Sequence, residues 1–101
     1  MKRKTKNYHD TLMNALKNPA EAVEYLSASL EEADAEQFLF ALRNVAEATR
    51  GIAKLSKKTR LNRESLYRML SKKGNPEFYS LNNILKALGF KLTVATEALR
   101  V

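Results

Sequence analysis

The chain has 101 residues, of which 45% are hydrophobic, and this is enough to bury the core of one compact domain. It contains no cysteine, so disulfide bonds, thiolate catalysis and cysteine-ligated zinc are excluded. No apolar run approaches the length of a membrane span, and residues 1–10 lack the apolar stretch of a signal peptide. We therefore expect a cytoplasmic protein without a membrane partner.

The net charge of +7 is distributed unevenly along the chain. Residues 50–75 carry nine Lys or Arg against one acid, whereas residues 18–49 carry seven acids against one Arg. A basic block beside an acidic block in a small domain favours two separate partner surfaces. The alternative is that both blocks are solvated faces without a partner.

Residues 1–7 are polar and basic without apolar periodicity, so we predict a flexible basic arm there. A short helix is expected over residues 10–17. Asn18 and Pro19 are typical of the next helix start, because Asn caps the first turn and Pro loses no hydrogen bond there. The apolar residues of that helix recur at helical spacing as Ala22, Val23, Leu26 and Leu30.

A capping Asp34 and a terminating Gly51 bound the following helix. The apolar stripe expected for it is Phe38, Leu39, Ala41, Leu42, Val45, Ala46 and Thr49. We expect the helices within residues 8–33 to pack on a second unit, residues 34–101, that carries the main function.

Residues 52–71 fit the helix-turn-helix pattern, in which two short helices are joined by a three-residue turn. The small Ser56 stands where the two helices nearly touch. The first turn residue is usually glycine because its backbone has positive φ, and Arg60 there is expected to cost about 1 kcal/mol. The positions that hold the helices at a steep angle are Leu55, Thr59, Leu61, Leu66 and Met69.

With Leu66, Met69 and Leu70 directed inward, the second helix of this motif exposes a face suited to base edges. Arginine matches O6 and N7 of guanine, asparagine matches adenine, and lysines neutralise phosphates. The predicted DNA-binding residues are Lys54, Lys57, Lys58, Arg60, Asn62, Arg63, Glu64, Tyr67, Arg68, Lys72 and Lys73. His9 is the only histidine and no nucleophile–base pair can be assembled, so we expect no enzyme activity, metal or cofactor.

A last helix is predicted to start at a capping Ser80 and to end at Gly89. After it, Phe90, Leu92 and Val94 alternate with other residues, which predicts a short β-strand. Because an unpaired edge strand invites pairing with another chain, this strand is expected to pair across a dimer.

Three sequence runs resemble those of the addiction-module antidote proteins, Hig-type antitoxins within the phage-repressor-like (Xre) class. They are RESLYRML at residues 63–70, GNP at residues 74–76 and KALGFKL at residues 86–92. The resemblance covers about residues 8–97. It implies an all-α, phage-repressor-like helix-turn-helix domain of five to six helices with a short C-terminal β-strand.

The resemblance also implies a function. Such a protein pairs with a small basic ribonuclease toxin of the RelE/Hig type, blocks it, and binds its own operator as a homodimer to regulate its transcription. The recognition residues implied for this chain are Asn62, Arg63, Glu64, Tyr67 and Arg68. Members of the family commonly have glycine where this chain has Arg60, so the chain departs from the family pattern at this turn.

Two other functions fit the same residues. The chain is either a stand-alone phage- or plasmid-type repressor without a toxin partner, or an interaction module whose basic face binds RNA or only keeps it soluble. A toxin-sized reading frame beside the gene separates the first alternative from an antitoxin. Salt-dependent binding to its own promoter DNA excludes the second alternative.

Overall fold

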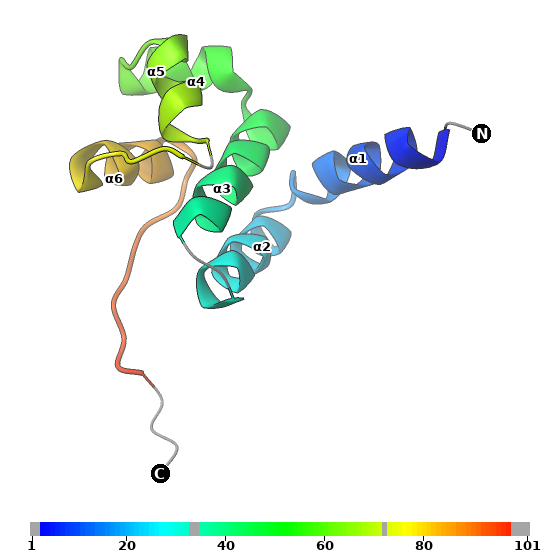
Figure 1. The fold of residues 1–101 in the computed structure, drawn as a ribbon, viewed down its shortest axis with the longest axis horizontal. Coiled ribbons are helices and arrows are strands. Elements are labelled where there is room, and N and C mark those ends of the chain that lie inside the picture. The colour runs from blue at the N-terminus through cyan, green and yellow to red at the C-terminus, as the bar shows by residue number, and fades with distance from the viewer. Residues whose placement is uncertain (1–2, 33–34, 72, 98–101) are drawn as a thin grey trace.

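The computed structural model describes residues 3–32, 35–71 and 73–97, in which the regular elements are all helices and no strand is present. The helices follow one another as α1 (Arg3–Ala15), α2 (Pro19–Glu32), α3 (Ala35–Thr49), α4 (Ile52–Thr59), α5 (Arg63–Met69) and α6 (Phe78–Ala87) (Figure 1). The predicted all-α class and the number of helices are confirmed for this part of the chain. None of these helices is both long and apolar enough to cross a membrane.

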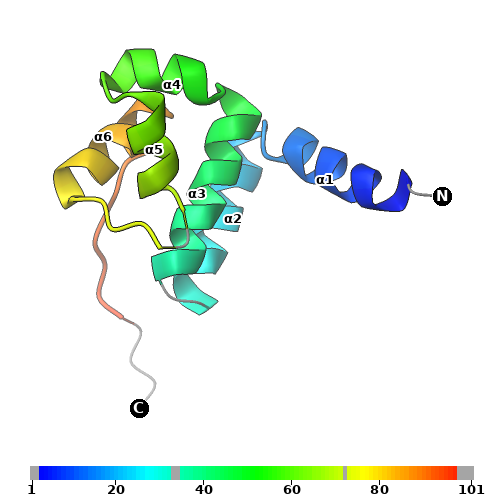
Figure 2. The same ribbon diagram turned by 45° about the horizontal axis from the view of Figure 1, so that its top comes forward.

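Helix α3 lies at the centre of the molecule and packs against α1, α2 and α4 (Figures 1 and 2). Its buried residues are Phe38, Leu39, Ala41, Leu42, Val45 and Ala46. They match the predicted stripe except for Thr49, which is exposed and donates its hydroxyl hydrogen to the Val45 carbonyl oxygen at 2.8 Å. Buried residues of α2, α4, α5 and α6 join these side chains in one core.

Helix α1 projects from the side of the molecule and contacts α3 near its own C-terminal end (Figure 1). It begins at Arg3 and not near residue 10, so the residues predicted as an arm are helical from position 3 onward. The prediction of an arm rested on the absence of an apolar stripe, but Arg and Lys have high helix propensity without one. Leu16, just beyond the helix, is buried and anchors this end to the core.

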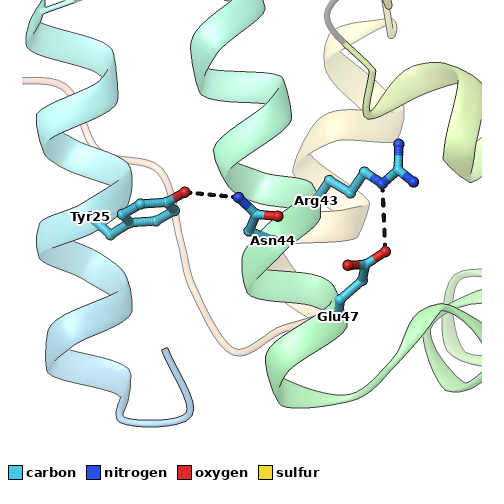
Figure 3. A network of polar contacts seen from close by, with 4 residues as sticks. All are labelled: Tyr25, Arg43, Asn44 and Glu47. Atoms are coloured by element: carbon cyan, nitrogen blue, oxygen red, sulfur yellow. Dashed lines mark hydrogen bonds and ion pairs between the residues drawn. The ribbon is translucent and has the colours of Figure 1, made fainter. Parts of the chain in front are cut away.

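Helix α2 starts as predicted, because the side-chain oxygen Oδ1 of Asn18 accepts a hydrogen bond from the Ala20 N–H at 2.9 Å. Only part of its apolar stripe is buried: Ala22 and Leu26 lie in the core, whereas Val23 and Leu30 are exposed. A polar contact also joins α2 to α3, since Asn44 Nδ2 donates to the Tyr25 hydroxyl oxygen at 2.9 Å (Figure 3).

Helix α6 begins at Phe78, with Glu77 at the N-cap, so the predicted cap Ser80 lies inside the first turn. Its C-terminal end follows the prediction. Gly89 has a φ of 93°, and its N–H donates to the Lys86 carbonyl oxygen while the Phe90 N–H donates to Leu85. These two bonds form a Schellman motif, which needs a residue in the left-handed region.

The predicted C-terminal β-strand is not present in the described part of the single chain. Residues 90–97 run on from α6 past α2 and α3 without forming a strand with any residue that the structure describes (Figure 1). The physical reason is that a strand needs a hydrogen-bonded neighbour, and a chain whose other described elements are all helices supplies none.

Candidate nucleic-acid interface

Helices α4 and α5 form the predicted pair of short helices, and they lie together at the end of the domain opposite α2 (Figures 1 and 2). Leu55 of α4 and Leu66 of α5 are fully buried, as is Leu70 directly after α5. Thr59 is also buried, while Leu61 and Met69 are half-buried against the core. The side chains predicted to hold the two helices together are therefore found inward.

The turn between the two helices has the backbone that the motif predicts. Arg60 has φ 67° and ψ 21°, and it is the one non-glycine residue with positive φ among the described residues. Its N–H donates to the Ser56 carbonyl oxygen at 2.8 Å, which closes the last turn of α4. The backbone of a residue with a Cβ thus occupies a left-handed conformation. This conformation costs roughly 1–2 kcal/mol, and glycine would adopt it freely.

Side-chain hydroxyls hold this turn in place. The Ser56 Oγ donates to the Leu61 carbonyl oxygen at 2.6 Å, and the Leu61 N–H donates to the Thr59 Oγ1 at 3.2 Å. Thr59 in turn donates its hydroxyl hydrogen to the Leu55 carbonyl oxygen at 2.8 Å. From α6, the Asn83 amide donates to the Thr59 carbonyl oxygen at 3.4 Å. The polar groups of the turn thereby gain the partners that burial requires.

Asn62 caps α5, because its Oδ1 accepts a hydrogen bond from the Ser65 N–H at 2.7 Å. A two-bond contact with adenine uses both the oxygen and the nitrogen of an asparagine amide. The oxygen of Asn62 is already engaged in the cap, so the geometry favours a structural role for this residue. The side chains of Arg63, Glu64 and Arg68 project outward as predicted.

The predicted phosphate-binding lysines are exposed where the structure describes them, at positions 54, 57, 58 and 73; Lys72 lies outside the described residues. None of the described cations between positions 54 and 73 forms an ion pair with a described residue, since the one such pair joins Arg43 to Glu47. Their charge is therefore not neutralised by the described part of the chain, and it remains available to a polyanion.

Sequence reasoning missed Arg43, which belongs to the acidic block but lies beside the basic face. Its Nε lies 3.6 Å from the Glu47 carboxylate (Figure 3), and its guanidinium lies over the ring of Tyr67 at 4.9 Å. A guanidinium at this distance attracts the face of an aromatic ring. The contact holds Tyr67 toward α3, so this residue lies at the margin of the α5 surface. The only sign of Arg43 in the sequence is that it is a single cation within an acidic block.

The described residues contain no group of three or more His, Cys, Asp or Glu side chains that is able to hold a metal ion. The features that the structure does bring together are an exposed helix with two arginines, a neighbouring helix with three lysines, and a rigid turn between them. This arrangement suits binding to an extended anionic surface.

Comparisons with known proteins place the chain in a family. A family model described as "probable addiction module antidote protein" matches residues 5–96. An uncharacterized protein of Haemophilus influenzae is 36% identical over 70 residues, which cover 69% of this chain and 71% of the relative. No solved structure matches. Since the family model spans nearly the whole chain, the protein belongs to the family of probable addiction module antidote proteins.

Proposed function

We propose that this chain is an antitoxin that binds operator DNA as a homodimer through α4 and α5 and represses its own transcription. In the same proposal it neutralises a small basic toxin of the RelE/Hig ribonuclease type, and it acts by binding and not by catalysis. The observation that carries the DNA-binding part is the cluster of exposed cations on α4, the turn and α5, none of which has an acidic partner among the described residues.

Within this surface the residues divide by position. Arg63 and Arg68 lie on the exposed face of the helix that follows the turn, where side chains reach base edges in the major groove. Lys54, Lys57 and Lys58 lie on the preceding helix, which crosses the backbone in this motif. We assign sequence discrimination to the two arginines and general affinity to the lysines.

The toxin-binding part of the proposal concerns the acidic residues of α2. Glu21, Glu24 and Glu31 are exposed there, and α2 lies at the end of the domain away from α4 and α5 (Figure 1). A basic toxin is attracted to such a surface, and charges at the rim of an interface act mainly on the rate of association. The separation of the two surfaces supports simultaneous binding of DNA and toxin.

The DNA-binding part is tested by fluorescence anisotropy with the promoter fragment of the gene and a shuffled fragment of the same length. Arg63→Ala and Arg68→Ala should each lower discrimination between the fragments by about 1–3 kcal/mol. Lys57→Ala should weaken binding to both fragments equally, whereas Lys17→Ala, a matched exposed lysine before α2, should change neither affinity.

The logarithm of the operator association constant should also fall with the logarithm of salt concentration, with a slope of about −0.9 for each phosphate neutralised. A slope near zero, or equal binding by the Lys57 and Lys17 variants, would contradict DNA binding by this surface. Equal loss on both fragments for the arginine variants would show that those residues contact phosphate.

The toxin-binding part is tested by co-expression with the protein encoded by the adjacent gene. Glu24→Lys combined with Glu31→Lys should slow association several-fold at low salt and less at high salt, with operator affinity unchanged. If the unmodified chain forms no complex with that protein and still binds its operator, a stand-alone repressor is the correct function.

A further inference from the structure

The segment after α6 has an unsatisfied backbone. The Phe90 N–H is bonded to Leu85, but no hydrogen bond joins the backbone of residues 91–97 to any part of the chain that the structure describes. The segment is extended in Figure 1 and exposed over residues 91–97. An extended stretch with free N–H and C=O groups is a template for pairing with another chain.

The two sides of this segment differ in chemistry. Phe90, Leu92 and Val94 alternate along one side, which Thr96 also shares, and Lys91 and Glu97 lie on the other. Phe90 packs on the core, and Leu92 borders two hollows of about 470 and 290 Å³ at the α2–α3 side of the molecule. Val94 is 98% exposed, so no residue that the structure describes covers it.

We propose that this segment binds a second copy of itself, with residues 91–97 of the two chains paired as antiparallel β-strands about a twofold axis at Val94. In this register Val94 lies opposite the partner's Val94, and Lys91 lies opposite the partner's Glu97. Residues directly opposite in an antiparallel pair point to the same side. One side of the pair therefore brings the two Val94 side chains together, with each Leu92 opposite the partner's Thr96, and the other side has two opposite-charge contacts.

The complementary charges of Lys91 and Glu97 favour a second copy of the chain as the partner, and they favour this pairing register. Moving the twofold axis to Thr93 or Ala95 keeps Leu92 and Val94 on the same side of the pair but removes the contact between Lys91 and Glu97. Lys91 and Glu97 cannot form an ion pair within one extended segment, because six rises of about 3.4 Å separate them by about 20 Å. This inference rests on the proposed function at one point: helix-turn-helix proteins that bind operators do so as dimers.

The test measures the dimer dissociation constant of the full chain without DNA, by analytical ultracentrifugation at low salt. Lys91→Glu and Glu97→Lys should each raise that constant about tenfold, because both chains then place like charges opposite each other. An equimolar mixture of the two variants should dimerise as tightly as the unmodified chain, since the heterodimer has two opposite-charge pairs. No restoration in the mixture would refute the register.

A second pair of variants tests the apolar side. Val94→Asp should weaken the dimer at least as much as either charge variant, with an unchanged melting temperature of the monomer because Val94 is exposed there. Tyr79→Asp, at a site that is 84% exposed on α6, is the matched control and should leave the dimer intact. A dimer that survives Val94→Asp and is lost with Tyr79→Asp would place the interface on α6 and overturn the proposal.

The proposed function and this inference fail in different ways. An unmodified chain that is monomeric in solution and still binds its operator would refute the strand pairing alone. A dimer with the expected charge pattern and no affinity for the operator would refute the proposed function alone. A monomer in which Val94→Asp abolishes binding of the adjacent gene's protein would show that the segment receives that protein, and the second-copy proposal would be wrong.

Discussion

Arg60→Gly is expected to make the protein more stable while weakening the DNA binding that we propose. The left-handed backbone at φ 67° costs a residue with a Cβ roughly 1–2 kcal/mol, and glycine avoids that cost. Glycine also gains conformational freedom in the unfolded chain, which offsets roughly 0.5–1 kcal/mol. The net effect is a gain of about 0.5–1 kcal/mol in the free energy of unfolding, or about 4 °C in Tm for a chain of this size.

The assay is urea denaturation followed by circular dichroism, with Arg60→Ala as the matched control. Alanine removes the same charge but retains the Cβ, so its stability should stay within about 0.5 kcal/mol of the unmodified chain. Both variants should lose operator affinity equally and should lower the salt slope by about 0.9 if Arg60 contacts a phosphate. The explanation is wrong if glycine and alanine give the same stability, or if glycine is the less stable of the two.

Three further substitutions test the packing of the domain by the same denaturation assay. Gly74→Ala should destabilise it by about 2 kcal/mol, because an added Cβ collides with the carbonyl oxygens at the end of α5; wild-type stability would contradict that close approach. Tyr25→Phe should cost about 1 kcal/mol, and adding Asn44→Ala should cost little more, since both remove one hydrogen bond; full additivity would contradict the contact. Thr59→Val should cost about 1–3 kcal/mol by leaving the Leu61 N–H without its acceptor, and an unchanged midpoint would show that water replaces the hydroxyl.

The helix ends that the sequence predicted correctly are those determined by local chemistry. Asn18 and Asn62 cap the helices that follow them, and both act through the side-chain oxygen as expected. Gly51 and Gly89 both have positive φ just beyond a helix. These devices involve residues only a few positions apart, so a sequence pattern is sufficient to identify them.

Burial on α2 was harder to predict, because the number of neighbours a helix has is a tertiary property. The spacing of Ala22, Val23, Leu26 and Leu30 shows that these residues share a side of the helix, but not how wide the contact with its neighbour is. Among the described helices α2 packs mainly on α3, so only Ala22 and Leu26 are buried. The same residue spacing on the central helix α3 predicted its buried positions correctly, apart from the exposed Thr49, because α3 has neighbours on several sides.

The features of the candidate site that depend on residues close in sequence were predicted, and its contact between residues far apart in sequence was missed. The exposed face of α5 and the left-handed turn follow from residues within one motif. The contact between Arg43 and Tyr67 joins residues 24 positions apart, and Arg43 lies in a block whose other charges are acidic. The C-terminal strand was predicted from correct alternation, but alternation carries no information about where a hydrogen-bonded neighbour comes from.

The central position of α3 means that the two ends of this protein share a single folding transition. α3 supplies six of the sixteen buried apolar side chains in the described part of the chain, and it contacts the acidic helix α2 on one side and α4 on the other. A cavity at Leu42 or Val45 would unfold both halves cooperatively rather than loosen one of them. Random mutagenesis will therefore yield α3 variants that lose every activity together, and variants that lose one activity alone will map to surface positions.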